Sequence, residues 1–196
     1  MPRTGLSAEE LRERAIDAAL ARIRLVGFDK VRLSDVARDI GISHAALYAH
    51  FVDKAALLDA VTRRWLSAVE DALAAVASSA AEPEERITEW FVTLYRMKRS
   101  RALEDPEPHK AFDIAAALDK PFVVAHLEHM LGELAALFAA LGGGKPRRQA
   151  ELAYAATAAF HHPTLVAQTA RHDREQQLRD IVALLLQGLA VGRQSA

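Results

Sequence analysis

The sequence predicts an all-α protein, in which a small N-terminal helical domain is followed by a larger helical domain. Apolar residues recur at helical spacing along most of the 196 residues, and no convincing run of alternating polar and apolar residues predicts a strand. Serine, aspartate, glycine and proline stand between these segments where helices typically begin and end. Half of the residues are apolar (51%), so a sizeable core can form, and we expect about nine helices.

Composition excludes several classes of protein. The chain has no cysteine, which rules out disulfides, thiolate catalysis and cysteine-ligated zinc. Its net charge of −1 means that any nucleic-acid binding must depend on a local patch, and residues 1–54 hold nine basic against eight acidic side chains. We see no signal peptide, and no uninterrupted apolar segment reaches the about 18 residues of a membrane span. We therefore expect a cytoplasmic protein that does not enter a membrane.

The first helix is expected to begin after Ser7, because Ser7-Ala8-Glu9-Glu10 has the form of a capping box. Apolar residues then recur at helical spacing as far as Ile23. Gly27 is well placed to end this helix with a positive φ.

Residues 32–51 predict two short helices joined by a three-residue turn. The first has one apolar face, formed by Leu33, Val36, Ala37 and Ile40. Gly41 would end it, Ile42 would point inward, and Ser43 can cap the second helix. We expect Ser34 and Ser43 to act first as caps and second as contacts to DNA.

Such a pair of short helices suits a helix-turn-helix, whose second helix enters the DNA major groove. Leu47 and Phe51 would hold that helix on the core. The residues left facing outward are His44, Ala45, Tyr48 and Ala49.

The remaining chain predicts longer helices. Asp53 can cap one that runs from Lys54 to about Ala77. Others are expected at about 84–102, 109–118, 121–141, 148–169 and 174–191, with Pro163 kinking or splitting the helix that contains it. The stretch from Gly142 to Pro146 is the clearest linker.

Residues 15–61 resemble the DNA-binding region of TetR-family transcriptional regulators. The resemblance covers about a quarter of the chain. The matching pieces are the Ala-Ala-Leu run of the first helix, Gly27-Phe28, Val36-Ala37, Gly41-Ile42-Ser43, Leu47-Tyr48, His50-Phe51 and Lys54-x-x-Leu57-Leu58. It implies a homodimer on a palindromic double-stranded DNA operator, with residues 1–54 as the DNA-binding domain and 55–196 as the effector and dimerisation domain.

The resemblance also implies roles for single residues. Bases would be read by His44, Ala45, Ala46 and Ala49, and phosphates would be held by Tyr48, His50 and the helix start at Lys54. Two positions depart from the family pattern. Arg32 stands where a threonine is frequent, so it can hold a phosphate but cannot cap, and Ala45-Ala46 replaces Gly-Thr. Direct hydrogen-bonded readout therefore falls mostly on His44.

The larger apolar and aromatic residues of the second domain are mostly core by their spacing, but helical bundles line ligand cavities with the same residue types. We expect an unknown small-molecule effector to bind in a pocket there. The residues expected to border it include Trp90, Leu94, Tyr95, Met97, Phe112, Met130 and Phe160.

The last two helices predict the dimer interface. Residues Leu178 to Leu189 make the final helix apolar on more than one face, so it needs partners on two sides. The helix before it is rich in alanine between Ala150 and Ala159, which allows close approach of another helix.

Enzyme and metal functions find little support. No Ser-His-Asp, phosphate-loop or paired-carboxylate motif stands out, and we expect neither an enzyme nor a cofactor. The pairs His126/His129 and His161/His162 leave metal binding open, although their spacing is not the commoner i, i+4 arrangement of zinc sites. The sequence thus predicts a ligand-responsive DNA-binding regulator, most simply a repressor. The alternative is a helical enzyme or small-molecule carrier with a vestigial helix-turn-helix.

Overall fold

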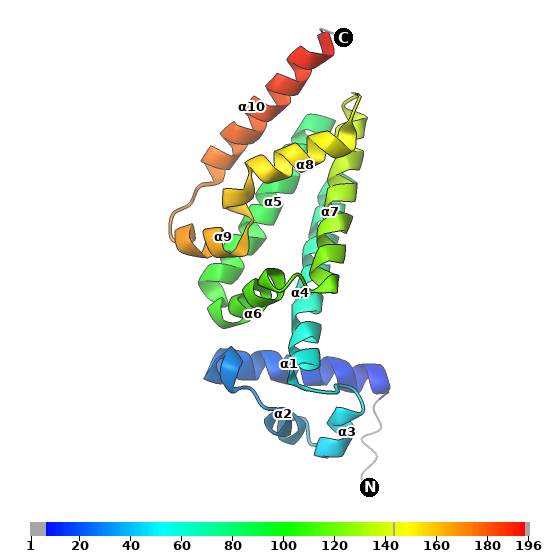
Figure 1. Ribbon diagram of the computed structural model, residues 1–196, viewed down its shortest axis with the longest axis vertical. Coiled ribbons are helices and arrows are strands. Elements are labelled where there is room, and N and C mark those ends of the chain that lie inside the picture. Colours follow the sequence, from blue (N-terminus) through cyan, green and yellow to red (C-terminus); the bar gives the residue numbers. More distant parts are fainter. Residues whose placement is uncertain (1–6, 143, 195–196) are drawn as a thin grey trace. The chain divides into compact units, whose positions relative to one another are not determined.

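The computed structural model describes residues 7–142 and 144–194, and side chains as far as residue 188. These ranges contain ten α-helices, two short 3-10 helices and no strand, which confirms the all-α prediction (Figure 1). The chain forms two compact units. The first unit comprises Met1–Trp65 and Asp105–Leu118, and the second comprises Leu66–Glu104 and Asp119–Ala196.

The first unit contains the predicted helix-turn-helix and one helix that comes from later in the chain. Figure 1 shows α2 and α3 on one side of α1. Its elements are α1 (Ala8–Val26), η1 (Phe28–Lys30), α2 (Leu33–Asp39), α3 (His44–Tyr48), the start of α4 (Lys54–Ala77) and α6 (Pro106–Ala117). The apolar core shared by α1, α2, α3 and the start of α4 includes Ala15, Ala19, Ile23, Val36, Leu47, Phe51 and Leu57.

Local signals set the boundaries of these helices as predicted. Ser7 and Glu10 form the capping box, since the Glu10 N–H donates to Ser7 Oγ at 3.2 Å and the Ser7 N–H donates to Glu10 Oε2 at 2.7 Å. Gly27 follows α1 with a φ of 89°, and Gly41 follows α2 with a φ of 73°. Residues with a Cβ rarely adopt a positive φ. Glycine at these two positions therefore permits the sharp turns that set α2 and α3 in place.

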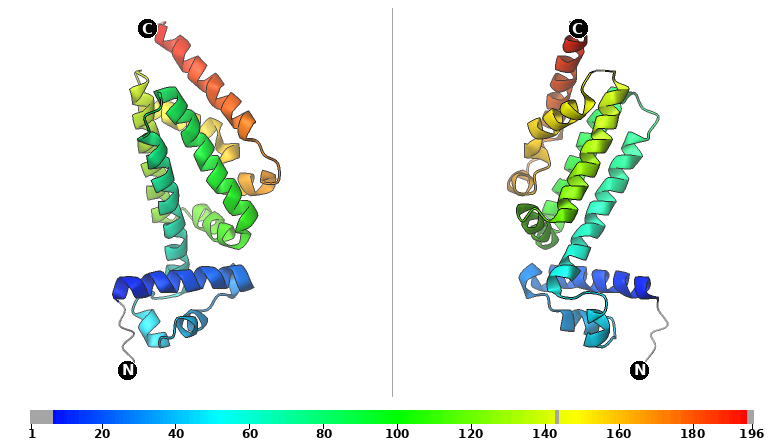
Figure 2. Two further views of the ribbon diagram at one scale, coloured as in Figure 1. Left: turned by 180° about the vertical axis from the view of Figure 1, so that it is seen from behind. Right: turned by 45° about the vertical axis from the view of Figure 1, so that its right-hand side comes forward.

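The second unit is a helical bundle. Its elements are the latter part of α4, α5 (Pro83–Glu104), α7 (Pro121–Ala140), α8 (Pro146–Ala156), η2 (Ala158–Phe160), α9 (Pro163–Thr169) and α10 (Glu175–Gln194). Helix α5 packs against α7, α9 and α10, and α7 packs against α8 (Figure 2). Trp90, Phe91 and Leu94 of α5 are almost fully buried in this bundle.

Two predicted helix boundaries are wrong. Helix α6 begins at Pro106 rather than near His109, because the first-turn N–H groups have no partner inside a helix and a proline costs nothing there. The helix predicted at 148–169 is three pieces, α8, η2 and α9. Pro163 splits it as predicted, but α8 already ends at Ala156, and the Thr157 hydroxyl then donates back to the Ala153 carbonyl at 2.8 Å.

Helix α7 is long and apolar enough to cross a membrane when judged by length and composition. A buried helix at the centre of a bundle meets the same criterion. Phe122, Leu134 and Phe138 of α7 are buried against other helices, and its polar His126 is bonded to Glu70 of α4. We therefore interpret α7 as a core helix of the second unit.

Candidate functional site

Helix α3 is short and is held by one cap and one buried side. The Ser43 hydroxyl accepts a hydrogen bond from the Ala46 N–H at 3.1 Å, which confirms the predicted cap. Leu47 is fully buried and Phe51, just after the helix, is 1% exposed. Because five residues do not form a stable helix alone, this burial determines which face of α3 remains outside.

The outer face of α3 is the one that the sequence predicts. His44, Ala45, Tyr48 and Ala49 are all exposed. Tyr48 is 44% exposed, so it is not a core tyrosine, and its ring meets the His44 ring edge-on at 4.6 Å between centroids. The two aromatic side chains thus form one small surface, with donors and acceptors at their tips.

The start of α4 lies close to α3 in the chain and is also built as predicted. Asp53 caps it, since Asp53 Oδ1 accepts a hydrogen bond from the Ala56 N–H at 2.7 Å. Lys54 is half-buried, and its amine donates to the Asp29 carbonyl at 2.7 Å and lies 5.8 Å from the centre of the Phe28 ring. An ammonium has three N–H groups, so two are left for other acceptors.

The other residues predicted to contact DNA differ in their exposure and in whether they cap a helix. Arg32 is exposed at the N-terminal end of α2 and makes no side-chain cap, as expected. The expectation that Ser34 caps a helix is wrong, because α2 begins at Leu33 and Ser34 is its second residue. Ala46 and His50 are half-buried, so they offer less surface than His44 or Tyr48.

Ion pairs occupy several acidic side chains of this unit. Arg22 binds Asp39 through two hydrogen bonds of 2.5 and 2.6 Å. These hydrogen bonds are the main cause that lowers the pKa of Asp39 below its ordinary value. Arg38 pairs with Asp35 at 2.7 Å. Within the described ranges Lys30 and Arg32 make no ion pair. Exposed positive charge is therefore left beside α2 although the charge of residues 1–54 nearly balances.

Several contacts in the first unit could not be found from the sequence. Arg12 Nη1 donates to the His50 carbonyl at 3.3 Å and its guanidinium lies 4.7 Å from the centre of the Phe51 ring. Arg24 of α1 binds Asp105 through two hydrogen bonds of 2.7 and 2.5 Å. Glu107 of α6 accepts a hydrogen bond from the Phe28 N–H at 3.1 Å. The contacts of Asp105 and Glu107 fasten α6 to the end of α1.

In the second unit, most residues predicted to line a pocket are tightly packed. Trp90 is fully buried and its indole N–H donates to Glu133 at 2.6 Å. Tyr95 accepts a hydrogen bond from the Arg174 N–H at 2.9 Å, and its ring lies 5.8 Å from that of Phe160. Leu94 and Met130 are also buried, and Met97 is half-buried.

Phe112 differs, because it belongs to the first unit, where its ring lies 5.1 Å from the ring of Trp65. The other six predicted residues share the second unit. The pocket assignment itself stays a prediction.

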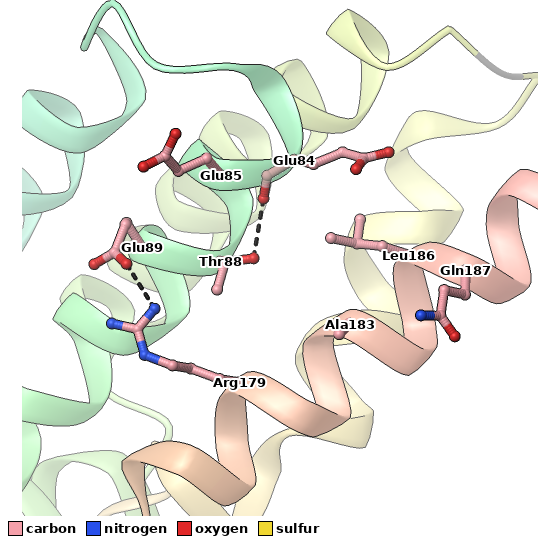
Figure 3. Close-up of a pocket in the computed structure, with 8 residues that line it drawn as sticks. All are labelled: Glu84, Glu85, Thr88, Glu89, Arg179, Ala183, Leu186 and Gln187. Atoms are coloured by element: carbon pink, nitrogen blue, oxygen red, sulfur yellow. Dashed lines mark hydrogen bonds and ion pairs between the residues drawn. The ribbon is translucent and has the colours of Figure 1, made fainter.

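A groove of about 430 Å³ lies between the first turns of α5 and the middle of α10 (Figure 3). Its lining residues are Glu84, Glu85, Thr88, Glu89, Arg179, Ala183, Leu186 and Gln187. Arg179 bonds to Glu89 at 2.7 Å. The other two acidic side chains of the groove, Glu84 and Glu85, take no part in that pair. None of the residues predicted to bind an effector lines it.

Three basic side chains are buried in the second unit. Lys98 is 2%, His126 5% and His161 6% exposed. Burial, and to a smaller extent the charge of Arg101, lowers the pKa of Lys98 to about 7. Burial likewise lowers the pKa of His161 to about 4. Among the described residues, no group of three or more histidine or acidic side chains lies close enough together to hold a metal ion.

Comparison with known proteins agrees with this geometry. Residues 15–61 match the family described as bacterial regulatory proteins, tetR family. Residues 83–182, more than half of the chain, match the tetracyclin repressor-like C-terminal domain. The chain belongs to the TetR family of transcriptional regulators. It is thus a DNA-binding regulator of a family that is not enzymatic, and the resemblance seen in the sequence is confirmed.

Individual TetR-family relatives are distant. The regulator BetI of Rhizobium meliloti is 37% identical over 89 residues, which are 45% of this chain and 43% of BetI. This chain therefore matches less than half the length of that relative. A protein assigned to the TetR family from Mesorhizobium loti has a similar structure, with a TM-score of 0.70, 21% identity and coverage of 95% and 98% of the two chains. FadR of Thermus thermophilus gives a TM-score of 0.63, 17% identity and coverage of 91% and 94%.

The buried lysine of this TetR-family protein leads to a prediction about stability. Lys98→Met should remove a dependence of stability on pH, because methionine is similar in size to lysine but does not titrate. The ordinary pKa of 10.5 applies in the unfolded chain, against about 7 in the folded protein. Between these values the unfolded state binds more protons, so the stability of the native protein falls as the pH is lowered from about 10.5 to about 7.

Urea unfolding at about pH 7 and about pH 9.5 would measure this difference. The stability of Lys98→Met relative to the native protein should be highest at the lower pH and fall at the higher one. Lys145→Met, at an exposed lysine, is the matched control and should show no such trend. Parallel stability curves for the native protein and Lys98→Met would contradict the prediction.

Proposed function

We propose that the protein is a ligand-responsive repressor, which binds a palindromic operator as a homodimer and is released by a small-molecule effector. The exposed outer face of α3, fixed by the burial of Leu47, is the observation that supports this proposal most. A helix held in this way can enter a major groove, about 12 Å wide, while its support stands back. As an operator-binding protein it would act in the cytoplasm.

The proposed DNA contacts fall into two groups. His44, with Ala45, Ala46 and Ala49, would meet base edges, and only His44 among them can form a side-chain hydrogen bond there. Tyr48, His50, Lys54, Arg32, Ser34 and Ser43 would contact or border the phosphates. Two of these already have tasks in the protein, since Ser43 caps α3 and Lys54 bonds to Asp29.

The proposed dimer interface is formed by α8 and α10. Leu178 and Val182 of α10 are buried within the unit, whereas Leu184 on another side is 67% exposed. On α8, Leu152 is 50% exposed beside the exposed Ala155 and Ala156. Both helices therefore expose apolar surface on a single subunit. Such surface suits a symmetric contact with a second copy of the chain. The side chain of Leu189, also predicted there, lies outside the described residues.

The effector is proposed to bind in the second unit, near Trp90, Leu94, Tyr95, Met97, Met130 and Phe160, with Phe112 as a further predicted neighbour. Two similar structures support a small-molecule effector for this fold. FadR of Thermus thermophilus was solved with lauroyl-CoA and FadR of Bacillus subtilis with stearoyl-CoA. The family argues against the alternative of a helical enzyme with a vestigial helix-turn-helix.

Two elements could carry a signal from the second unit to the operator-binding face. Helix α4 contributes residues to both units. Helix α6 belongs to the first unit but follows α5 after a single residue, Asp105, and leads into α7. A ligand that favours one position of α5 or α7 would therefore bias α6 and α4, and through them the spacing of the two α3 helices. It can do so only by binding the two states with different affinity.

The DNA contacts lead to a first prediction for this function. His44→Ala should weaken binding to the operator and spare binding to a scrambled duplex, because base contacts carry the sequence information. Tyr48→Phe should weaken both by a similar factor of about five, equivalent to one hydrogen bond of about 1 kcal/mol.

Fluorescence anisotropy with DNA from upstream of the gene and a scrambled duplex would measure both effects. His172→Ala, at an exposed histidine of the second unit, is the matched control. Equal loss on both duplexes for His44→Ala, or loss confined to the operator for Tyr48→Phe, would reverse the assigned roles.

The interface gives a second prediction. Leu184→Glu should convert the dimer to monomers, because a symmetric contact would bury the new charge twice. Leu184 is exposed within the subunit, so the fold itself should survive. Light scattering measures the mass. Leu25→Glu, at a 78% exposed leucine of α1, is the control that should stay dimeric. A dimeric Leu184→Glu protein would remove this face of α10 from the interface.

The attachment of α6 gives a third prediction. Arg24→Ala removes both hydrogen bonds to Asp105. Because Arg24 is 54% exposed, the loss should be small, about 0.2–1 kcal/mol. Hydrogen exchange in Asp105–Leu118 should rise by up to about fivefold, while α2 and α3 stay as protected as before. Arg14→Ala on the same helix is the control, and unchanged exchange in α6 would show that this pair does not fasten it.

A further inference from the structure

The His44 and Tyr48 side chains are packed together on the outer face of α3. They are the first and last residues of this helix. Residues four positions apart are neighbours on a helix surface, and a helical side chain leans toward the N-terminus, so the Tyr48 ring lies back toward His44. The two ring centroids are 4.6 Å apart and the ring planes are nearly perpendicular, at 87°. Aromatic rings favour this arrangement, in which the positive edge of one ring meets the negative face of the other.

The Tyr48 ring is the contact that restricts the His44 imidazole. Among the described residues, His44 makes no hydrogen bond and no ion pair through its side chain. The neighbouring Ser43 hydroxyl is occupied as the cap of α3. Ala45 and Ala49, which also face outward, have side chains too short to hold an imidazole. Without the Tyr48 ring, His44 would therefore turn freely among its rotamers.

The hydroxyl of Tyr48 takes no part in this contact. Tyr48 is 44% exposed although its ring packs against His44. Within the described ranges its hydroxyl makes no hydrogen bond, so it is available to a phosphate. The ring and the hydroxyl of one residue can thus act on different groups, and substitutions can remove them separately.

We propose that the ring of Tyr48 is a positioning group, which holds the His44 imidazole in the orientation that reads a base edge. The proposal rests on the function proposed above, and it assigns part of the sequence discrimination to a residue whose own contact is to a phosphate. A hydrogen bond to a base depends on direction, and His44 is the residue proposed to form it. An imidazole that is held before binding loses less conformational freedom when it meets the operator.

The test measures the ratio of operator affinity to scrambled-duplex affinity by fluorescence anisotropy. Tyr48→Phe keeps the ring and should keep the native ratio, although both affinities fall. Tyr48→Leu should lower the ratio by about the same factor as His44→Ala, about fivefold, because each loses the same base hydrogen bond. The variant that combines His44→Ala with Tyr48→Leu should lower it no further, since residues that act as one unit have non-additive effects.

Two measurements separate positioning from a purely structural role. Leucine is a good helix former, so hydrogen exchange of the α3 amides should be the same in Tyr48→Leu as in Tyr48→Phe. An aromatic ring current shifts the NMR signals of protons that lie close to the ring. The signals of the His44 ring protons in the free protein should therefore move in Tyr48→Leu and stay in place in Tyr48→Phe.

An unchanged ratio in Tyr48→Leu would overturn the proposal. Losses that multiply in the combined variant would also overturn it, because Tyr48 would then act on DNA independently of His44. Faster exchange of α3 in Tyr48→Leu would show a structural role instead. In each of these cases a native protein that prefers its operator keeps the regulatory function. If the native protein binds both duplexes equally, the proposed function fails and the positioning role fails with it.

Discussion

The burial of Leu47 is the constraint on which the proposed DNA-binding surface depends. Helix α3 has only five residues, so its own hydrogen bonds cannot keep it folded. Leu47 is inserted in the core of the first unit, and Phe51 continues that contact just beyond the helix. With the inner face fixed in this way, His44 and Tyr48 are left on the outer face. The proposed recognition surface is thus set by the packing of the opposite, buried face of the helix.

Helix α6 changes how the two units should be viewed. The chain leaves the second unit at Asp105, adds one helix to the first unit, and returns at Asp119. Arg24 and the Phe28 N–H hold that helix at the end of α1. Together with α4, it makes the first unit a composite of segments that are far apart in the sequence. A division of the chain at residue 54 describes the motif but not the compact body that contains it.

The sequence was sufficient where the signals are local. Apolar spacing, Ser43 and Asp53 are short-range features, and the helix-turn-helix follows them closely. Pairs such as Arg24–Asp105 could not be predicted, because they join exposed residues 81 positions apart and leave no periodic trace. Lys98 does leave a signal in the sequence. It continues the buried stripe of Ile87, Phe91 and Leu94 on α5, at a position where an apolar residue would be expected.

The ion pairs between α1 and α2 have a consequence for how the protein would respond to ionic strength. Arg22 and Arg38 are occupied by Asp39 and Asp35, so they are poorly placed to neutralise phosphates. Among the described residues of the first unit, Lys30 and Arg32 make no ion pair, and Lys54 keeps two N–H groups for other acceptors, so these side chains are better placed to displace counterions from DNA. The logarithm of affinity falls with the logarithm of salt concentration in proportion to the phosphates neutralised. Arg22 and Arg38 are therefore not expected to add to this salt dependence, which should be less steep than the number of basic residues in the first unit would suggest.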